Sequence, residues 1–492
     1  MNFFIGADIG TTGIRAGVYD EDFNLLGSGS GQSFVKRGSK GEIIQEADGM
    51  YAETAKAVKG AVEQARIDPK RIACISFDGQ MAGVMGIDEN WNAVTPYDSW
   101  LDTRCSAQVA KISERAHDLV VKRTGIIPSY NHGPKILWWK EEEPGIYKCI
   151  KSFVQPAAYA AGRLCGLGGE EAFIDWSYIH FSGYADNRSL KWDEELTGMF
   201  GVDTGKLPRI ISPLTVIGRT GTRGAALFGV PAGVPVAAGC GDTASCFLGT
   251  GAVSPGVAVD VAGTASVLAL TTDRFIADTE GLVYSSRSVI DDTWYTMSYI
   301  NGGGLNLEWF REVFRPETGF DELDRSIRGI GPGSDGLMFV PHLEGRAYPN
   351  DPDMRGQWNG FTRAHGAAHF YRSVLEGIGY EYALYMERIL DNLGGDAVYD
   401  VRGVAGGSRS EVWCQMKADI LGCNYCTINR EDISILGQAL IAAAAVGAKK
   451  NIREAAEGII EVVKTYKPDQ NNHRVYRSYV QRYREMLKKK DS

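Results

Sequence analysis

The alternation of apolar and polar positions at the start of the chain predicts a β-hairpin. An apolar run that begins at Phe3 leads into the turn Gly10-Thr11-Thr12, and a second apolar run, residues 14–18, follows it. The same pattern predicts alternating strands and helices in the first part of the chain. The strands are expected at Phe3–Asp8, Ile14–Tyr19, Leu25–Phe34, Ile72–Phe77 and Gly83–Ile87, and the helices at Ala47–Ala65, Arg104–Ala116 and Lys135–Lys140.

The pattern restarts in the second half of the chain. Residues 224–239 are rich in Gly, Pro and Ala, which indicates the approach to a domain junction. A strand, a Gly-Thr turn and a returning strand come next, and mostly helices follow. The strands are expected at Gly256–Val261, Ser266–Leu270 and Val398–Arg402, and the helices at Gly304–Val313, His365–Leu393, Ser410–Leu421, Ser434–Val446 and Val475–Lys490.

The turn at Gly263-Thr264 repeats the turn at Gly10-Thr11, about 250 residues further along the chain. Two halves built in this way would place the two turns opposite each other, with the phosphates of a nucleotide between them in an interdomain cleft. Chance similarity of two short Gly-Thr turns is the alternative, and the turns alone favour neither explanation.

Composition and charge narrow the class of protein. The chain has 492 residues, of which 44% are hydrophobic and 23% charged, which is typical of a globular protein of two or three domains. The net charge of −9 argues against nucleic acid or an anionic membrane as the main partner.

No segment of the sequence indicates secretion or membrane insertion. The N-terminus lacks a basic region before its apolar run, and the run Ala439–Ala448 is about half the length of a membrane span. The nine cysteines, an odd number, argue against a disulfide framework and favour a cytoplasmic location. Cys423 and Cys426 form a single CxxC pair, which argues against a zinc site.

The first hairpin carries side chains that suit nucleotide phosphates and their metal ion. Asp8 can bind Mg²⁺ directly or through water, Thr11 and Thr12 can donate to phosphate oxygens, and Arg15 adds positive charge. A plain hairpin with an aspartate before its turn is the alternative, and the motif alone leaves both open.

Asp242 follows an apolar run, residues 234–238, and a glycine turn, so it should lie at the carboxyl edge of a sheet. A carboxylate at that edge could act as a general base on an alcohol. Asp is also a good N-cap, and without other context a cap of the helix that begins at Thr243 is the better explanation.

Two glycine-rich segments precede predicted helices. Gly406-Gly407 would let a flat or anionic ligand approach the backbone. Gly304 opens a helix with Glu308 and Trp309 one turn in, for which a flexible turn and a core tryptophan are the simpler explanation. Neither segment is a GxGxxG motif or a Walker A loop.

Two polar–aromatic clusters lie near predicted strand ends, at residues 77–83 and 99–104. Polar groups beside an aromatic ring suit the hydroxyls and the face of a sugar. Each cluster is weak evidence alone.

Taken together and in order, these segments resemble the FGGY carbohydrate kinases, which include glycerol, xylulose and ribulose kinases. The resemblance extends from Ile5 to about Ala448 and is closest in pattern to xylulose kinases. The segments in family order are Asp8-x-Gly10-Thr11-Thr12-x-x-Arg15, Gln80-Met81, Trp100-x-Asp102-x-Arg104, Gly241-Asp242, Gly263-Thr264, Gly304-x-x-x-Glu308-Trp309 and Gly406-Gly407-x-Arg409-Ser410.

The resemblance implies an α/β fold of two actin-like ATPase (ribonuclease H-like) domains with the active site in the cleft between them. We expect an N-terminal domain, residues 1–240, for sugar and phosphate, and a C-terminal domain, residues 241–492, for ATP. The implied reaction moves the γ-phosphoryl group of ATP, with Mg²⁺, to a hydroxyl of a ketose or polyol, a pentulose such as xylulose being the first choice.

The resemblance also implies a role for each motif residue. Asp242 is the implied catalytic base, Asp8 the carboxylate that organises Mg²⁺ and phosphate, and both are implied metal ligands. The implied ATP-binding residues are Thr11, Thr12, Arg15, Gly263, Thr264, Gly304, Glu308, Gly406, Gly407 and Ser410, and the implied sugar-binding residues are Gln80, Met81, Ala82, Trp100, Asp102 and Asp242.

Two positions depart from the family pattern. Ala82 stands where xylulose kinases carry a histidine, which removes a donor to the ketose, and Ala265 stands where a serine is usual. Met81-Ala82 also lacks the Arg-Glu pair of glycerol kinases, so glycerol is not expected. His132 could replace the missing histidine in space, although a lone loop histidine is usually solvated.

Two other function classes stay open. The departures at Ala82 and Ala265 would suit a non-catalytic sugar sensor on a kinase scaffold, although a sensor does not need Asp242 as a base. An actin-like ATPase that drives a partner would leave Gln80 and Trp100 unexplained. The expected partner is a small sugar, and a homodimer is the commonest default assembly.

Overall fold

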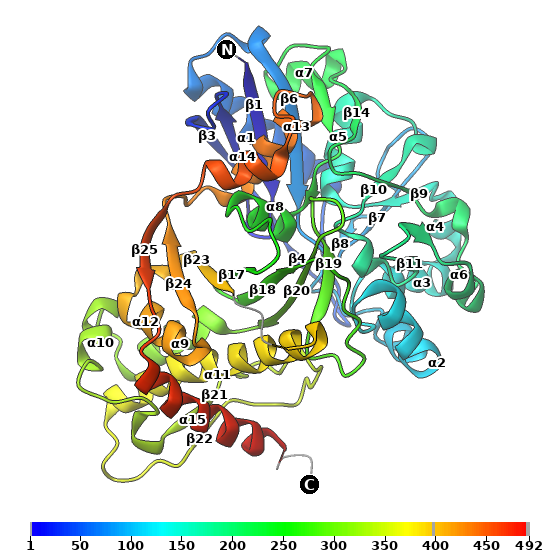
Figure 1. The fold of residues 1–492 in the computed structure, drawn as a ribbon. Helices are drawn as coiled ribbons and strands as arrows, with labels where there is room; N and C mark the ends of the chain where they lie inside the picture. The colour runs from blue at the N-terminus through cyan, green and yellow to red at the C-terminus, as the bar shows by residue number, and fades with distance from the viewer. Residues whose placement is uncertain (1, 396–398, 489–492) are drawn as a thin grey trace.

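Two seven-stranded mixed sheets form the framework of the protein (Figure 1). The computed structural model describes residues 2–395 and 399–488. The first sheet has the order β14-β15-β6-β1-β2-β3, with β16 paired to β6, and the second has the order β19-β20-β18-β17-β23-β24-β25. The strands of the first sheet are β1 (Phe3–Ile9), β2 (Gly13–Tyr19), β3 (Leu25–Gln32), β6 (Ile72–Gly79), β14 (Val216–Arg219), β15 (Pro235–Ala237) and β16 (Cys240–Gly241). Those of the second are β17 (Val257–Ala262), β18 (Ser266–Thr272), β19 (Tyr284–Arg287), β20 (Trp294–Ile300), β23 (Asp400–Val404), β24 (Asn424–Ile428) and β25 (Val462–Tyr466).

Short strands and helices complete the structure. The short strands are β4 (Lys36–Arg37), β5 (Ile43–Gln45), β7 (Met85–Ile87), β8 (Tyr97–Asp98), β9 (Ser152–Val154), β10 (Phe173–Asp175), β11 (Ala185–Asp186), β12 (Lys191–Trp192), β13 (Arg209–Ile211), β21 (Met338–Val340) and β22 (Gln357–Asn359). The helices up to the second sheet are α1 (Ala47–Ala65), α2 (Ser106–Thr124), α3 (His132–Glu142), α4 (Pro144–Cys149), α5 (Pro156–Cys165), α6 (Glu194–Phe200), α7 (Thr222–Phe228) and α8 (Asp242–Gly249). The later helices are α9 (Gly303–Phe314), α10 (Phe320–Ser326), α11 (Ala367–Leu393), α12 (Glu411–Leu421), α13 (Ile433–Ala445), α14 (Ile452–Gly458) and α15 (Gln470–Lys488).

Helix α13 joins the far end of the chain to the first sheet, against which it lies in Figure 1. All seven residues of β1 are buried, and Gly6 in this strand brings the backbone of α13 very close. A Cβ on Gly6 would come within 2.0 Å of the carbonyl oxygen of Ile435, so only glycine fits. One apolar cluster includes Phe4 from β1, Val259 from β17 and Ala439 from α13, so the core is continuous between the sheets.

Most elements expected from the sequence are confirmed within a few residues. Helix α1 has the expected bounds, and the two hairpins β1–β2 and β17–β18 are antiparallel as expected. The helix expected at 104–116 is wrong at its end, because α2 continues to Thr124 past a kink at Ala116 (φ −149°, ψ 20°). Val398 and Lys490, at the edges of two expected elements, lie outside the described residues.

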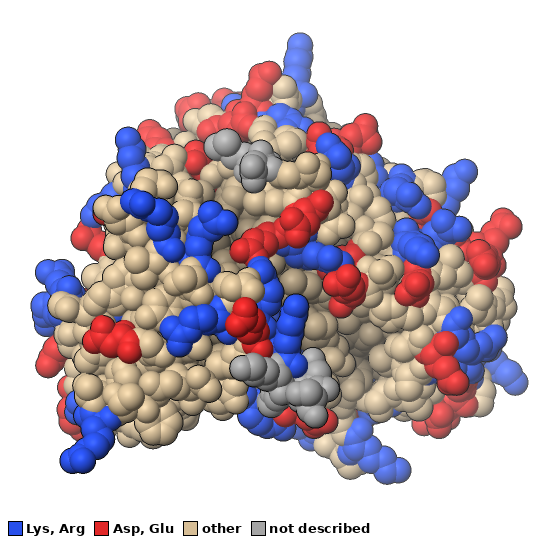
Figure 2. All heavy atoms as spheres, turned by 60° about the horizontal axis from the view of Figure 1, so that its bottom comes forward, with Lys and Arg blue, Asp and Glu red and all other residues tan. Residues whose placement is uncertain are grey.

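Two features bear on what the molecule can contact: the hydropathy of its helices and the charge on one of its faces. Among the described helices, none combines the length and the apolar character needed to cross a bilayer. On the face at the bottom of Figure 1, basic and acidic side chains are interspersed (Figure 2).

Candidate active site

The first hairpin fixes the orientation of Asp8 at the end of β1. Asp8 pairs across the hairpin with Arg15, whose Nη2 donates to Asp8 Oδ2 at 2.8 Å. Ser434 of α13 donates its hydroxyl to the same oxygen at 2.9 Å. Asp8 is 5% exposed, while the Arg15 side chain is 62% exposed and can meet a ligand.

Three carboxylates meet where β1, β6 and β16 end side by side. Asp78 in β6 is the register partner of Asp8, and Gly79 is the register partner of Gly241, directly before Asp242. Asp78 is fully buried, and within the described part of the chain neither of its carboxylate oxygens has a hydrogen-bond partner. Burial, with the charges of Asp8 and Asp242, raises the pKa of Asp78 well above its ordinary range.

Asp242 is the first residue of α8, and Gly241 holds the N-cap position. Asp242 therefore does not occupy the N-cap position of this helix, which was the simpler explanation for an aspartate at this point of the sequence. Its Oδ1 accepts hydrogen bonds from the amide and the hydroxyl of Thr243, at 2.5 and 3.0 Å. Burial, and secondly the charge of Asp8, raises the pKa of Asp242 to about 7.

This carboxylate set fits Mg²⁺ bound together with phosphates. No group of three or more His, Cys, Asp or Glu side chains among the described residues forms a complete metal cage. Mg²⁺ usually takes only one or two protein carboxylates and completes its shell with phosphates and water. The two oxygens of Asp78 beside Asp8 lack partners among the described residues, and a cation bound there would satisfy them and favour the ionised carboxylate.

A cavity of about 520 Å³ lies beside the second hairpin. It brings together residues from three separate segments of the second half of the chain that were singled out from the sequence. They are Gly263, Thr264, Gly304, Glu308, Gly406, Gly407 and Ser410.

Close backbone packing shapes this cavity. The amide of Gly304 donates to the carbonyl of Gly263 at 3.0 Å, and a Cβ on Gly304 would come within 2.4 Å of that oxygen. A Cβ on Gly407 would come within 2.5 Å of the Trp413 ring. Glycine is therefore required at both positions for steric reasons alone.

Asp324 of α10 is a cavity residue that the sequence did not reveal. It accepts hydrogen bonds from Ser410 Oγ at 2.5 Å and from the Tyr371 hydroxyl at 2.9 Å. Ser410 also caps α12 by accepting from the amide of Trp413 at 3.2 Å. Asp78 lies in the cluster at residues 77–83 that the sequence singled out, but its place beside Asp8 was not predicted, because it depends on the parallel pairing of β6 with β1.

The residues expected around the sugar lie next to the first hairpin. Trp100, 42% exposed, donates its Nε1–H to Thr11 Oγ1 at 2.9 Å, and Thr11 donates to Gln80 Oε1 at 3.1 Å. Met81 packs on Gly241, where a Cβ would come within 2.4 Å of Met81 Cε. Ala82 has φ of +61°, a left-handed conformation that is uncommon outside glycine.

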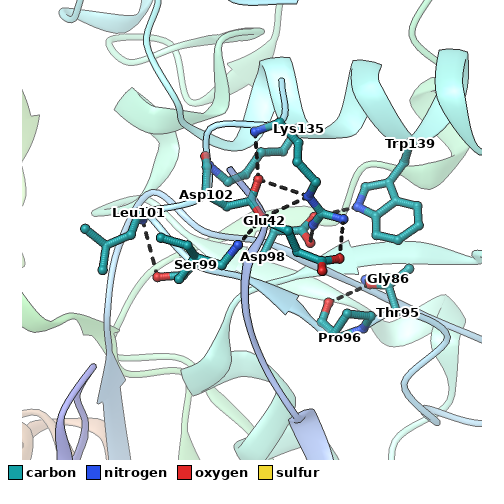
Figure 3. Close-up of polar contacts among 12 residues, drawn as sticks. Glu42, Gly86, Thr95, Pro96, Asp98, Ser99, Leu101, Asp102, Lys135 and Trp139 are labelled. Atoms are coloured by element: carbon teal, nitrogen blue, oxygen red, sulfur yellow. Dashed lines mark hydrogen bonds and ion pairs between the residues drawn. The ribbon is translucent and has the colours of Figure 1, made fainter. Parts of the chain in front are cut away.

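Asp102 belongs to a buried network that holds the Trp100 loop (Figure 3). Its carboxylate accepts from the amide of Ile43 at 2.8 Å and from Arg104 Nε at 2.9 Å. Arg104 also donates to Asp98, which accepts from Trp139 Nε1 as well. Asp102 is 1% exposed, so it positions the loop, and direct contact with sugar stays a prediction.

Comparison with known proteins identifies the family. Sequence models of the FGGY family of carbohydrate kinases match residues 3–249 with the N-terminal domain and residues 258–446 with the C-terminal domain. The chain belongs to the FGGY family of carbohydrate kinases. The resemblance drawn from the motifs is confirmed, as is the two-domain α/β fold class.

Relatives of this FGGY kinase cover nearly its whole length. The xylulose kinase of Bacillus subtilis is 26% identical over 98% of this chain and 96% of its own. The gluconokinase of the same species is 28% identical over 97% and 94%. The crystal structure of a xylulose kinase from Brucella ovis, 25% identical, superposes with a TM-score of 0.89 over 99% of this chain and 98% of its own.

The fold extends to more distant members. The Plasmodium falciparum glycerol kinase structure with ADP, 19% identical, has a TM-score of 0.89 over 99% of this chain and 98% of its own.

The family models and the relatives together show that the protein is an ATP-dependent carbohydrate kinase, a phosphotransferase with an alcohol group as acceptor. Nothing in these comparisons supports the sensor or the actin-like ATPase.

Proposed function

We propose that this kinase phosphorylates a hydroxyl of a neutral ketose or polyol of about pentose size, with a pentulose such as xylulose as the first candidate. The observation that carries the proposal is Asp242, a half-buried carboxylate with a pKa of about 7, set beside the phosphate-binding hairpin. A base with this pKa is half ionised near neutral pH, which suits proton removal from an alcohol. Xylulose kinases among the relatives support the pentulose.

In the proposed mechanism the protein positions reactants and compensates charge, because phosphoryl transfer needs little covalent work from an enzyme. Thr11, Thr12 and Arg15 bind phosphate from one side, and Thr264 binds it from the other. ATP occupies the 520 Å³ cavity, with Gly406, Gly407 and Ser410 near the adenosine and Gly304 and Glu308 beside it.

Asp8 and Asp242 would hold Mg²⁺, which offsets phosphate charge when bound. Asp242 accepts the proton of the attacking sugar hydroxyl as its oxygen bonds to the γ-phosphorus and the bond to ADP breaks. Gln80, Met81, Ala82 and Trp100 border the sugar, and Asp102 supports them through the Trp100 loop.

Domain division, location and assembly are parts of the same proposal. The division into residues 1–240 and 241–492 and a cytoplasmic location are supported by the sequence arguments given above, whereas the homodimer is only the commonest default assembly. Light scattering on the purified chain tests the homodimer directly.

The deciding experiment is a coupled assay of ADP release over ketopentoses, ketohexoses, polyols and aldonic acids. Wild type should release ADP with at least one neutral sugar. Asp242→Asn should lower that turnover roughly 10²–10⁴-fold, because the general base is lost, while retaining nucleotide binding by calorimetry.

Asp273→Asn, an exchange at an exposed carboxylate, is the matched control and should behave as wild type. Equal turnover in Asp242→Asn would remove Asp242 from the base role. Folded, ATP-binding wild type that is silent on the whole panel would overturn the proposed substrate class.

A further inference from the structure

The loop that leads into α3 carries two buried polar side chains without partners. Asn131 is 3% exposed and His132 is 2% exposed. Within the described residues, Asn131 Oδ1 and both ring nitrogens of His132 lack any hydrogen-bond partner. Asn131 stands at the N-cap of α3 but makes no side-chain cap. Buried polar atoms left unpaired are costly, so these three atoms need a partner that the described chain does not supply.

A chain of contacts connects His132 with the proposed reaction centre. The His132 ring lies 6.3 Å, centroid to centroid, from the ring of Tyr178. The Tyr178 hydroxyl donates to the carbonyl of Gly79 at 2.8 Å, and Gly79 pairs with Gly241, directly before Asp242. Tyr178 also shares an apolar cluster with Met81. Tyr178 thus links His132 to both Met81 and the Asp242 turn.

The start of α3 is also fastened to the Trp100 loop. Lys135, buried one turn into α3, donates to the carbonyl of Asp102 at 3.1 Å (Figure 3). It also donates to the carbonyl of Tyr130. The ammonium of Lys135 is thereby used to join the two loops. Asn131 and His132 are held against the same loop that carries Trp100.

The chemistry of the pair suits uncharged hydroxyls. Burial, and then the neighbouring His180 and Lys135, lowers the pKa of His132 to about 3, so its imidazole is neutral near pH 7. A neutral imidazole donates through one nitrogen and accepts through the other, and a sugar hydroxyl does both. Asn131 Oδ1 can accept from a second hydroxyl. Ala82 offers no polar side-chain atom for this purpose.

We propose that Asn131 and His132 form a hydroxyl-binding subsite that recognises a neutral sugar next to Asp242. The subsite rests on the proposed function and deepens it, because it names the residues that select the substrate. A neutral imidazole offers no positive charge to balance the carboxylate of a sugar acid, so the subsite favours ketoses and polyols over aldonic acids.

The test compares His132→Phe, which keeps the ring volume but removes both nitrogens, with His132→Gln, which restores hydrogen bonding. D-xylulose, its monodeoxy analogues, D-ribulose, xylitol and D-gluconate serve as probes, in steady-state assays and in calorimetric titrations without ATP. His117→Phe, the same exchange at a partly exposed site on α2, is the matched control.

His132→Phe should lower kcat/KM for the preferred neutral sugar about ten-fold, mainly through KM, because one neutral hydrogen bond is lost. The loss should vanish for the one deoxy analogue that lacks the contacted hydroxyl, and His132→Gln should recover part of it. Asn131→Ala should show the same selectivity for a different hydroxyl, and it provides the test if His132→Phe does not fold.

An equal loss for every analogue, or no loss, would overturn the subsite and leave a packing or water-binding role for His132. These results presuppose a wild type that phosphorylates a neutral sugar in the panel. If wild type phosphorylates only gluconate, the proposed substrate class fails and the subsite fails with it.

Discussion

The two Gly-Thr hairpins are alike in backbone and different in how the chain supports them. Beside the first hairpin, Asp8 forms an ion pair with the exposed Arg15 and also accepts a hydrogen bond from Ser434. In the second, Val261 takes the place of Asp8, and the nearest carboxylate, Asp260, points into the core.

Asp260 is fully buried, pairs with the equally buried Lys417 at 2.5 Å, and accepts from the hydroxyls of Tyr382 and Tyr425, both at 2.7 Å. The second hairpin is instead held by backbone contact, since the carbonyl of Thr264 accepts from the amide of Leu305 at 3.2 Å. One hairpin therefore brings charge to the cluster of Asp8, Asp78 and Asp242, whereas the other brings backbone close to the 520 Å³ cavity. The repeated turn shows shared architecture, and the carboxylate beside it decides the chemistry.

The largest expected effect is on stability, at the second hairpin. Asp260→Asn leaves Lys417 charged and unpaired in the core, and this should lower the free energy of unfolding by about 3–5 kcal/mol. Urea denaturation measures the loss, and the activity of the remaining folded fraction should be largely retained. The double variant Asp260→Asn/Lys417→Met should regain part of the stability, because it removes the stranded charge. A loss below about 1 kcal/mol would show that the Asp260–Lys417 pair contributes little to the stability of the second half of the molecule.

At the first hairpin the effect should fall on turnover. Asp8→Asn should lower kcat roughly 10²–10³-fold, because the charge that organises metal and phosphate is lost. The free energy of unfolding should change little, because the ion pair that is lost has the exposed Arg15 as its partner and such pairs contribute little to stability. Thr264→Ala is the counterpart on the second hairpin and should cost only about ten-fold in kcat/KM, the worth of one hydrogen bond. Similar losses in the two variants would contradict the division of roles between the hairpins.

The sequence predicts this comparison only in part. The hairpins, the bounds of α1 and the order of the motifs follow from local patterns, because turn residues and periodicity act over a few positions. The position of Asp78 beside Asp8 does not follow from a local pattern, because it comes from parallel pairing with a strand some seventy residues away, a spacing set by the whole sheet.

His132 shows the same limit. A histidine in a loop is expected to be solvated, but the structure starts α3 at this residue and buries it against Tyr178. Tertiary packing, which no local pattern encodes, decides its exposure. Asp324 likewise lines the 520 Å³ cavity only because α10 packs beside Ser410.

The smallest expected effect is the change that the Asp8 charge makes to proton binding by Asp242, which separates the two hairpins electrostatically. The folded-state pKa of Asp242, about 7, lies above its ordinary value of 3.8, so between these values the folded protein binds more protons than the unfolded chain. The stabilisation from this group is therefore complete below about pH 4 and is lost as the pH rises through about 7. The difference in unfolding free energy between wild type and Asp242→Asn, measured against pH in EDTA, should trace this loss.

In an Asp8→Asn background the loss should be complete at a lower pH, because the Asp8 charge is the second cause of the raised pKa of Asp242, after burial. Thr264→Ala should leave the profile where it is, since the second hairpin brings no charge to Asp242. A profile that moves in neither background would mean that burial alone sets this pKa, and one that moves equally in both would mean that the first hairpin has no electrostatic control of its own over Asp242.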